Sequence, residues 1–363
     1  MNERSIIIDA KTLESFMKDV FVGIGVPKGD AEICAEVLIT SDLRGIESHG
    51  VQRLRMYYDR IKTGVQSAVT KIKVVKETRT TARLDAGHGM GHIAAYRAME
   101  MAIKKAKKNG TGAVSVGNST HFGIAGYYSQ MAIKEGMIGI TITNARPSIP
   151  PTFGVEPMLG TNPLTIGIPT DEEFPFLIDC ATSITQRGKI ETLARTNTPI
   201  PEGWVIDQNG EPLTDSIGIL DGLTKGIAAL LPLGGPGETL GGHKGYGYAT
   251  AVEILSSALW GGPFMKDLNN PKTYLLGHFF IAIDVDSLIG LDDFKKRAGD
   301  ICRALRNSKK SPDEERIYTA GEKEYYMEIE RRKTGIPINK SILNDLLAMK
   351  SELSLSGYEF PSL

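Results

Sequence analysis

Cysteine is scarce in this chain of 363 residues, which holds only Cys34, Cys180 and Cys302. An odd number of distant cysteines excludes a disulfide framework and a zinc-binding spacing, and it is typical of a reducing compartment. A long apolar run is also missing near the start, where Ile6–Ile8 is closed by Asp9. This patch is too short for a signal peptide or a membrane-spanning helix, so a cytoplasmic protein is predicted.

An excess of either charge is lacking as well. The chain has 42 Lys and Arg against 43 Asp and Glu, a net charge of −1, and no long basic run. Binding to nucleic acid or to an anionic membrane is therefore not predicted.

The common nucleotide fingerprints are absent too. No Gly-x-Gly-x-x-Gly follows a predicted strand, and the nearest stretch, residues 87–92, has His92 where the third glycine would stand. No Gly-x-x-x-x-Gly-Lys-Ser/Thr occurs. The sequence thus predicts neither a Rossmann fold nor a P-loop, and a nucleotide site would need another architecture.

Hydrophobic patterning predicts three regions: helices in 1–75, alternating strands and helices in 76–290, and helices again in 291–363. The first 65 or so residues are expected to be entirely helical. Strands are expected over 72–76, 80–86, 112–116, 137–143, 164–168, 176–179 and 278–284, with an Asn-Gly turn at 209–210. The prediction is a central α/β domain with a helical domain formed from both chain ends.

His121 stands at the tip of a glycine-rich corner between a predicted strand, 112–116, and a predicted helix, 126–135. Such corners place polar groups in a cleft, where a histidine exchanges a proton near neutral pH. The alternative, of equal weight on this stretch, is a histidine that only caps the corner. His88 and His92 lie four residues apart without a carboxylate partner, so no metal site is predicted.

A second polar cluster lies just before the third predicted helix. Ser48, His49 and Arg53 bring together a hydroxyl, an imidazole and a guanidinium group, and Tyr57 shares a helix face with Arg53. Arginine binds a carboxylate through two hydrogen bonds, and a neighbouring histidine can give a proton to an alkoxide. The alternative is that Ser48 caps the helix and the arginines are solvated.

Four further stretches are typical either of an anion-binding site or of turns, helix caps and close packing without a ligand. Residues 144–148 and 160–164 carry Asn and Thr beside predicted strands. These side chains can donate hydrogen bonds to a phosphate, or they are ordinary turn residues. Residues 179–183 end a strand and are expected to start a helix, as a phosphate site or a plain N-cap. Residues 241–247 present Lys244 at the start of a buried helix, as an anion site or a place of close packing.

Together these stretches form an ordered set of motifs. They are Arg44-Gly45-x-x-Ser48-His49-Gly50, Asn118-Ser119-x-His121-Phe122-Gly123-x-Ala125-Gly126-x-Tyr128, Gly160-Thr161-Asn162-Pro163, Asp179-x-Ala181-Thr182-Ser183 and Gly242-His243-Lys244-Gly245-Tyr246-Gly247. The set resembles the type-2 malate/L-lactate dehydrogenase family, which also includes ureidoglycolate, sulfolactate and diketogulonate enzymes and cyclic-imine reductases. The resemblance extends over nearly the whole chain.

This resemblance implies a non-Rossmann NAD(P)-dependent oxidoreductase of 2-hydroxy and 2-oxo acids, usually a homodimer. It implies that His121 and His49 face the substrate and that one of them is the acid/base. The implied substrate-binding residues are Ser48, Arg53 and Tyr57. The implied cofactor site is lined by Ser148, Asp179, Ala181, Thr182, Ser183, His243, Lys244, Gly321 and Glu322. The chain departs from the family pattern at Ala320, often proline there, and in the additional residues 236–240.

Malate is the predicted substrate, because its second carboxylate would suit Arg44, Arg55 and Arg146. Another family substrate, cyclic-imine reduction and a non-catalytic nucleotide-binding protein on the same fold are the alternatives. The cofactor is NAD or NADP, since Arg187 and Lys189 suit either a 2′-phosphate or the pyrophosphate. The expected partners are a small-molecule substrate and a second copy of the chain.

Overall fold

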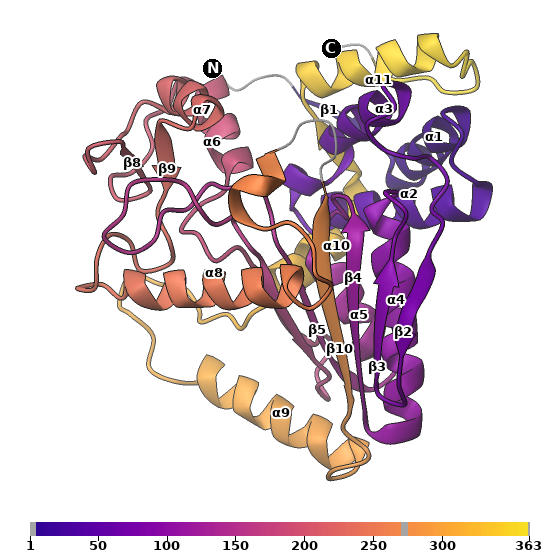
Figure 1. Ribbon diagram of the computed structural model, residues 1–363, viewed down its shortest axis with the longest axis vertical. Coiled ribbons are helices and arrows are strands. Elements are labelled where there is room, and N and C mark those ends of the chain that lie inside the picture. The colour runs from indigo at the N-terminus through magenta and orange to yellow at the C-terminus, as the bar shows by residue number, and fades with distance from the viewer. Residues whose placement is uncertain (1–4, 270–274, 362–363) are drawn as a thin grey trace.

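A mixed β-sheet runs through the centre of the molecule (Figure 1). The computed structural model describes residues 5–269 and 275–361. Within them, β3 and β4 run parallel and every other neighbouring pair of the sheet is antiparallel. In spatial order the strands are β2 (Lys73–Glu77), β3 (Thr81–Asp85), β4 (Thr111–Ser119), β10 (Leu276–Asp284), β5 (Met137–Thr143), β6 (Leu164–Ile168) and β7 (Phe176–Cys180). The predicted α/β class is confirmed, and the late strand β10 separates β4 from β5.

Helices cover both faces of this sheet. On one face lie α4 (Gly91–Asn109) and α5 (Ala125–Lys134), and on the other lies α8 (Gly242–Ser257). Two glycines of β4 allow the close approach. A Cβ at Gly112 would lie 2.1 Å from the carbonyl oxygen of Ala102 in α4, and one at Gly117 would lie 1.9 Å from the ring of Trp260, just after α8. Side chains alternate along a strand, so these two glycines face opposite layers.

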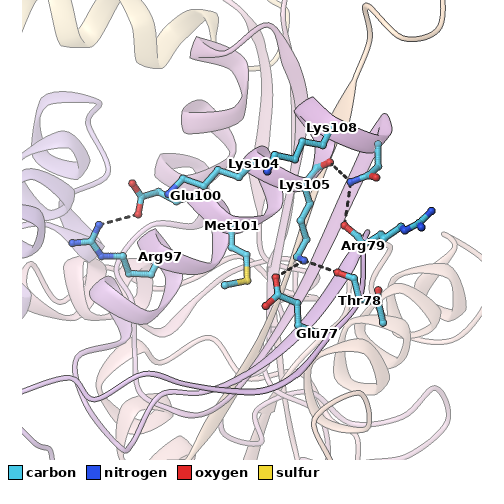
Figure 2. A pocket seen from close by; sticks show the side chains of 10 residues that line it. Glu77, Thr78, Arg79, Arg97, Glu100, Met101, Lys104, Lys105 and Lys108 are labelled. Atoms are coloured by element: carbon cyan, nitrogen blue, oxygen red, sulfur yellow. Dashed lines mark hydrogen bonds and ion pairs between the residues drawn. The ribbon is translucent and has the colours of Figure 1, made fainter.

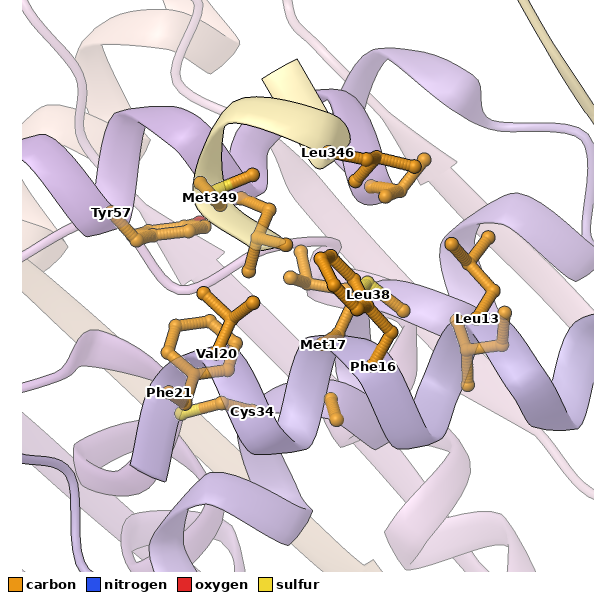
Figure 3. Close-up of a cluster of buried hydrophobic side chains, with 14 of the residues drawn as sticks. Leu13, Phe16, Met17, Val20, Phe21, Cys34, Leu38, Tyr57, Leu346 and Met349 are labelled. Carbon is orange, nitrogen blue, oxygen red and sulfur yellow. The ribbon is translucent and has the colours of Figure 1, made fainter. Parts of the chain in front are cut away.

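The two ends of the chain meet in one helical layer (Figure 3). Its helices are α1 (Ala10–Gly23), α2 (Lys28–Leu43), α3 (Leu54–Lys62) and α11 (Lys340–Glu352). Phe16, Leu38, Leu346 and Met349 are fully buried in its core. This confirms that the N-terminal helices pack with a helix from the other chain end.

A small pair of strands in this layer was not predicted. β1 (Ile6–Ile8) pairs antiparallel with β11 (Ile336–Ile338), so the first 65 residues are not entirely helical. Three-residue strands carry no periodic signal of their own, and this pair forms only because residues more than 300 positions apart come together. Asp9 then starts α1 by accepting a hydrogen bond from the Thr12 N–H at 2.9 Å.

The C-terminal helices divide between two places. α10 (Glu322–Thr334) lies against α2, where Arg331 donates to the carbonyl oxygen of Asp42. α9 (Leu291–Arg306) instead lies at the far end of the molecule (Figure 1), where Arg303 pairs with Asp171 and Glu172 after β6. The expectation that helices of 291–363 pack with the N-terminal helices is therefore wrong for α9, because its ion pairs tie it to the sheet.

A separate small core lies beyond β7. It contains α6 (Arg187–Arg195), β8 (Val205–Asp207), α7 (Ser216–Lys225), β9 (Ala228–Leu230) and η3 (Met265–Asn269). Ile190, Val205 and Ile219 are among its buried residues. The predicted Asn-Gly turn is confirmed, with the Asn209 N–H bonded to Asp207 Oδ1 at 2.8 Å. The expected helix start at 179–183 is wrong, because the Thr182 N–H bonds to Thr161 O and α6 begins only at residue 187.

Candidate active site

His121 lies in the corner that follows β4, as predicted. Thr120 fixes this corner, since its hydroxyl donates to Gly89 O at 2.9 Å and accepts the Gly91 N–H at 3.0 Å. Gly123 has a φ of +78°, a conformation that favours glycine, and turns the chain into α5. The corner holds the imidazole of His121 half-buried.

His49 reaches the same place from the other layer. It ends η1 (Glu47–His49), which with η2 (Val51–Arg53) leads from α2 to α3. Its half-buried ring stacks on that of His121, with centroids 5.4 Å apart and planes 21° apart. The two histidines that the sequence offered as alternatives therefore lie in one site.

Each imidazole has its Nδ1 atom engaged by a hydroxyl group. Tyr57 Oη lies 2.5 Å from His121 Nδ1, and the main-chain nitrogen of Gly123 lies 3.3 Å from the same atom. Ser48 Oγ lies 2.9 Å from His49 Nδ1. Hydroxyl groups both donate and accept, so they can follow a change of protonation at Nδ1. The Nε2 atoms are thereby left for chemistry.

Burial lowers the pKa of both imidazoles. The pKa of His49 falls to about 4 through burial and then through the charge of Arg53. The pKa of His121 falls well below its usual value through burial, then through His49 and Arg53. Both rings are neutral near pH 7, and because like charges repel, the stack accepts one proton at a time. Burial raises the pKa of Tyr57, so its phenol stays protonated.

Arg53 completes this group. Its Nε donates to the carbonyl oxygen of Ser48 at 2.6 Å, while its guanidinium lies 4.0 Å from Glu191 in α6. The side chain is 26 % exposed, so it is open to a substrate carboxylate. The structure thus brings together all five residues offered for catalysis and substrate binding. Ser48 hydrogen-bonds to His49 rather than capping a helix.

Two of the arginines offered for a second carboxylate have other partners. Arg55 forms ion pairs with Asp59 and Glu352, and Arg44 is buried 3.6 Å from Glu328. Neither is therefore placed as a free cation for substrate. The third, Arg146, lines a cavity beside Ser148.

This cavity, of about 720 Å³, fits an anionic cofactor. Among the described residues its charged lining comprises one acid, Glu156, and four cations, Arg146, Arg187, Lys225 and Lys266. Lys266 pairs with Glu156, and Lys225 and Arg187 pair with acids on their own helices. A dinucleotide carries its negative charge on phosphates, which such a lining would attract. One lining residue, Arg187, directly follows Gln186, whose amide donates to Ser48 Oγ at 3.3 Å.

The remaining residues offered for the cofactor lie in three other places. The hydroxyl groups of Thr182 and Ser183 donate to main-chain carbonyl oxygens, and Ala181 directly precedes them. Asp179 accepts the Gly126 N–H at 2.7 Å at the start of α5.

The segment 179–183 is the first of these places, and the second and third are two helix starts. His243 and Lys244 are exposed in the first turn of α8, behind the tight loop that contains residues 236–240. Gly321 adopts a φ of +90° before α10, and buried Glu322 pairs with Arg316 and accepts the Thr319 N–H at 3.0 Å. These residues do not line the cavity beside Ser148.

Sequence reasoning missed Gln186, Lys225 and Lys266. Gln186 touches Ser48 across 138 positions, and the two lysines reach the Ser148 cavity from different elements. None of the three stands in a motif, so no local pattern marked them. Their positions depend on the packing of the small core beyond β7, which brings residues distant in the sequence together.

A second basic groove, of about 690 Å³, lies between the β2–β3 turn and α4 (Figure 2). Its charged groups pair with one another, Lys105 with Glu77 at 2.7 Å and Arg97 with Glu100 at 2.8 Å. Because no candidate residue lines it, this groove is not part of the candidate site.

Within residues 5–269 and 275–361, no group of three or more His, Cys, Asp and Glu side chains is arranged to hold a metal ion. His88 Nε2 lies 2.6 Å from Val65 O, and His92 is buried against Tyr57. In the same stretch of chain no helix is long and apolar enough to cross a membrane.

A stacked pair of neutral imidazoles beside an arginine is suited to proton transfer on an anionic substrate. The chain matches the model of the malate/L-lactate dehydrogenase family over residues 8–347, and it belongs to that family. It is therefore an oxidoreductase that acts on a CH–OH group with a nicotinamide cofactor.

Similar proteins match along their whole length. A malate dehydrogenase of Pyrococcus abyssi is 45 % identical over 99 % of this chain and 98 % of the relative. An L-sulfolactate dehydrogenase of Methanocaldococcus jannaschii is 39 % identical, over 98 % and 96 %. The crystal structure of malate dehydrogenase from Entamoeba histolytica superposes with a TM-score of 0.96 at 44 % identity, over 99 % and 100 %.

Proposed function

We propose that this chain interconverts malate and oxaloacetate with NAD or NADP, and that a histidine of the stacked pair moves the proton. The observation that carries the chemistry is the stack of His49 on His121 beside Arg53. The choice of malate is supported by the relatives from Pyrococcus abyssi and Pyrococcus horikoshii, named malate dehydrogenases at 45 % and 44 % identity.

The protein's part in the reaction follows from this geometry. Arg53 binds the C1 carboxylate and so orients C2 of the substrate. The bound nicotinamide supplies the hydride acceptor for oxidation and the hydride donor for reduction. In oxidation, Nε2 of a neutral histidine takes the C2 hydroxyl proton, and in reduction the protonated ring returns it. Meanwhile the hydroxyl of Tyr57 or Ser48 accepts from Nδ1 of the charged ring.

The first test is a rate assay that follows reduced-nicotinamide absorbance. The purified protein is given NAD or NADP with malate, lactate, sulfolactate and ureidoglycolate, and in reverse the 2-oxo acids and a cyclic imino acid. Turnover with malate and oxaloacetate is the expected result, and the same rates choose between NAD and NADP. Turnover with another substrate alone would replace malate. Silence on every substrate, with cofactor still bound, would contradict the proposal.

Tyr57→Phe is expected to lower kcat about tenfold and to leave KM for malate nearly unchanged. The change removes one hydrogen bond to His121 Nδ1, worth about 1–1.5 kcal/mol, and leaves the buried ring in place. Steady-state kinetics check this prediction. Tyr58→Phe, which removes a hydroxyl bonded to Glu352 outside the site, is the matched control. A large rise in KM with unchanged kcat would instead make Tyr57 a substrate-binding residue.

We also propose that the chain forms a homodimer through the exposed face of α8 and the turn after it. Tyr248, Ile254 and Leu259 are 58 %, 55 % and 45 % exposed there, and Leu255 lies between them. Several exposed apolar side chains on one helix and the turn after it are typical of an interface. The family resemblance makes a second copy of the chain the expected occupant.

Ile254→Lys is expected to shift the protein from dimer to monomer, because a buried charge without a partner disfavours the interface. Light scattering coupled to size-exclusion chromatography measures the mass. Val74→Lys, at a similarly exposed position on β2, is the control and should keep the wild-type mass. A wild-type protein that elutes as a monomer at all concentrations would refute the assembly.

A further inference from the structure

Asp42 is a fully buried acid directly beneath the His49 segment. It lies near the end of α2 and is 1 % exposed. Its Oδ2 atom accepts the main-chain N–H of Val51 at 2.8 Å. Val51 is two residues beyond His49, at the join between η1 and η2. The carboxyl group thus holds the segment that presents the imidazole.

Gly50 shows how closely the chain passes over this carboxyl group. A Cβ at Gly50 would lie 1.8 Å from Asp42 Oδ1, so any side chain there would collide with it. This contact fixes the main chain at Gly50, just before the hydrogen-bonded N–H of Val51. The two residues after His49 therefore rest on Asp42, Gly50 by packing and Val51 by its hydrogen bond.

The charged groups that face Asp42 are Glu47 in η1 and Arg331 in α10. Arg331 donates to the main-chain oxygen of Asp42 at 2.5 Å and pairs with the Glu47 carboxylate. Burial raises the pKa of Asp42 to about 8, and Glu47 adds to the rise, while the Val51 N–H and Arg331 oppose it. At neutral pH the carboxyl group is accordingly protonated, and it ionises in mildly alkaline solution.

We propose that Asp42 is a positioning residue for the reaction, whose buried carboxyl group seats Gly50 and Val51 and so sets where the ring of His49 lies. This rests on the proposed function, in which His49 faces the substrate. Displacing a catalytic group by about 1 Å can cost about 100-fold in rate. Ionisation of Asp42 places a buried charge under the segment that the Val51 N–H and Arg331 compensate only in part, so it disfavours the seated arrangement.

Two substitutions separate the parts of this role. Asp42→Asn keeps a neutral oxygen that accepts from Val51, so it is expected to retain most of the kcat at pH 7. The wild type should lose kcat with a midpoint near pH 8, and Asp42→Asn should not show that loss. Asp42→Ala removes the hydrogen bond and is expected to lower kcat about 10- to 100-fold with cofactor affinity unchanged.

Stability supplies a check on the same ionisation. The pKa of Asp42 is raised from 3.8 to about 8 in the folded state, so the folded protein holds the proton more tightly. The unfolding free energy of the wild type is expected to fall as pH rises across that range, and this contribution should vanish in Asp42→Asn. Asp30→Asn, at the other end of α2, is the control that should leave the pH profile of kcat unchanged.

Histidine NMR tests the inference without turnover. The chain has six histidines, so the His49 ring signal is assigned from its loss in His49→Gln. In the wild type this signal should shift with a midpoint near pH 8, and in Asp42→Asn it should not. An identical titration in both proteins, or wild-type kcat and pH profile in Asp42→Ala and Asp42→Asn, would overturn the proposal. Silence on every substrate would instead refute the proposed function and leave the NMR result to decide on Asp42.

Discussion

Replacing the acid/base histidine by alanine is expected to lower kcat for malate oxidation by about 10²- to 10⁴-fold while the Kd for the cofactor stays near its wild-type value. His121 and His49 are the two candidates, because their rings form one stack and each has its Nδ1 atom beside a hydroxyl group. The variants to compare are His121→Ala, His49→Ala and the double variant. If one single variant has the same kcat as the double variant, the histidine replaced in that single variant is the acid/base.

The other histidine is expected to act on substrate binding, so its loss should raise KM more than it lowers kcat. Stopped-flow and steady-state kinetics separate these effects. If both single variants kept near-wild-type kcat, histidine acid–base catalysis would be wrong. Non-additive losses are expected, since one ring affects the pKa of the other.

The pH dependence of the wild type follows from the same stack. Both imidazoles have lowered pKa values, so the neutral form needed for oxidation persists below pH 6.5. The acidic limb of kcat/KM is therefore expected below the usual histidine range. An acidic limb at or above pH 6.5 in the free enzyme would contradict the burial of the pair.

The second large effect is expected at Arg53. Arg53→Gln should lower kcat/KM for malate by roughly 30- to 150-fold, or about 2–3 kcal/mol, mainly through KM. The reason is the loss of the charged fork that binds the C1 carboxylate. Arg53→Lys keeps the charge but loses the two parallel hydrogen bonds, so it should recover only part of the affinity.

Arg55→Gln is the matched control for this experiment. Arg55 lies two residues further on, but its guanidinium pairs with Asp59 and Glu352 outside the site. It should therefore change stability slightly and leave KM near the wild-type value. Equal losses in Arg53→Gln and Arg55→Gln would show that Arg53 has no specific role in substrate binding.

Much of the fold could be predicted because its long elements have strong periodic patterns. The helix with Leu13, Phe16 and Val20 buries the expected face, and the strand that became β5 has its predicted limits. Short or context-dependent elements could not be predicted. β1 and β11 exist only as partners of each other, and α9 lies by the sheet because of ion pairs with Asp171 and Glu172.

The side chains available for chemistry could be identified from the sequence alone. Ser48, His49 and Arg53 lie within six positions, and His121 stands in a glycine-rich corner, so local spacing was enough to select them. The assignment of Ser148 to the cofactor stays a prediction, supported by its place in a basic cavity.

Only the tertiary structure decided how these groups act together. The 5.4 Å stack of His49 on His121 and the contact of Tyr57 with His121 join segments more than 60 positions apart. The low pKa values depend on this stack and its burial, and the seat of His49 depends on Asp42 beneath Gly50. Spacing along a chain fixes neighbours within a helix or strand, whereas desolvation and ring contacts are set by the packing of distant elements.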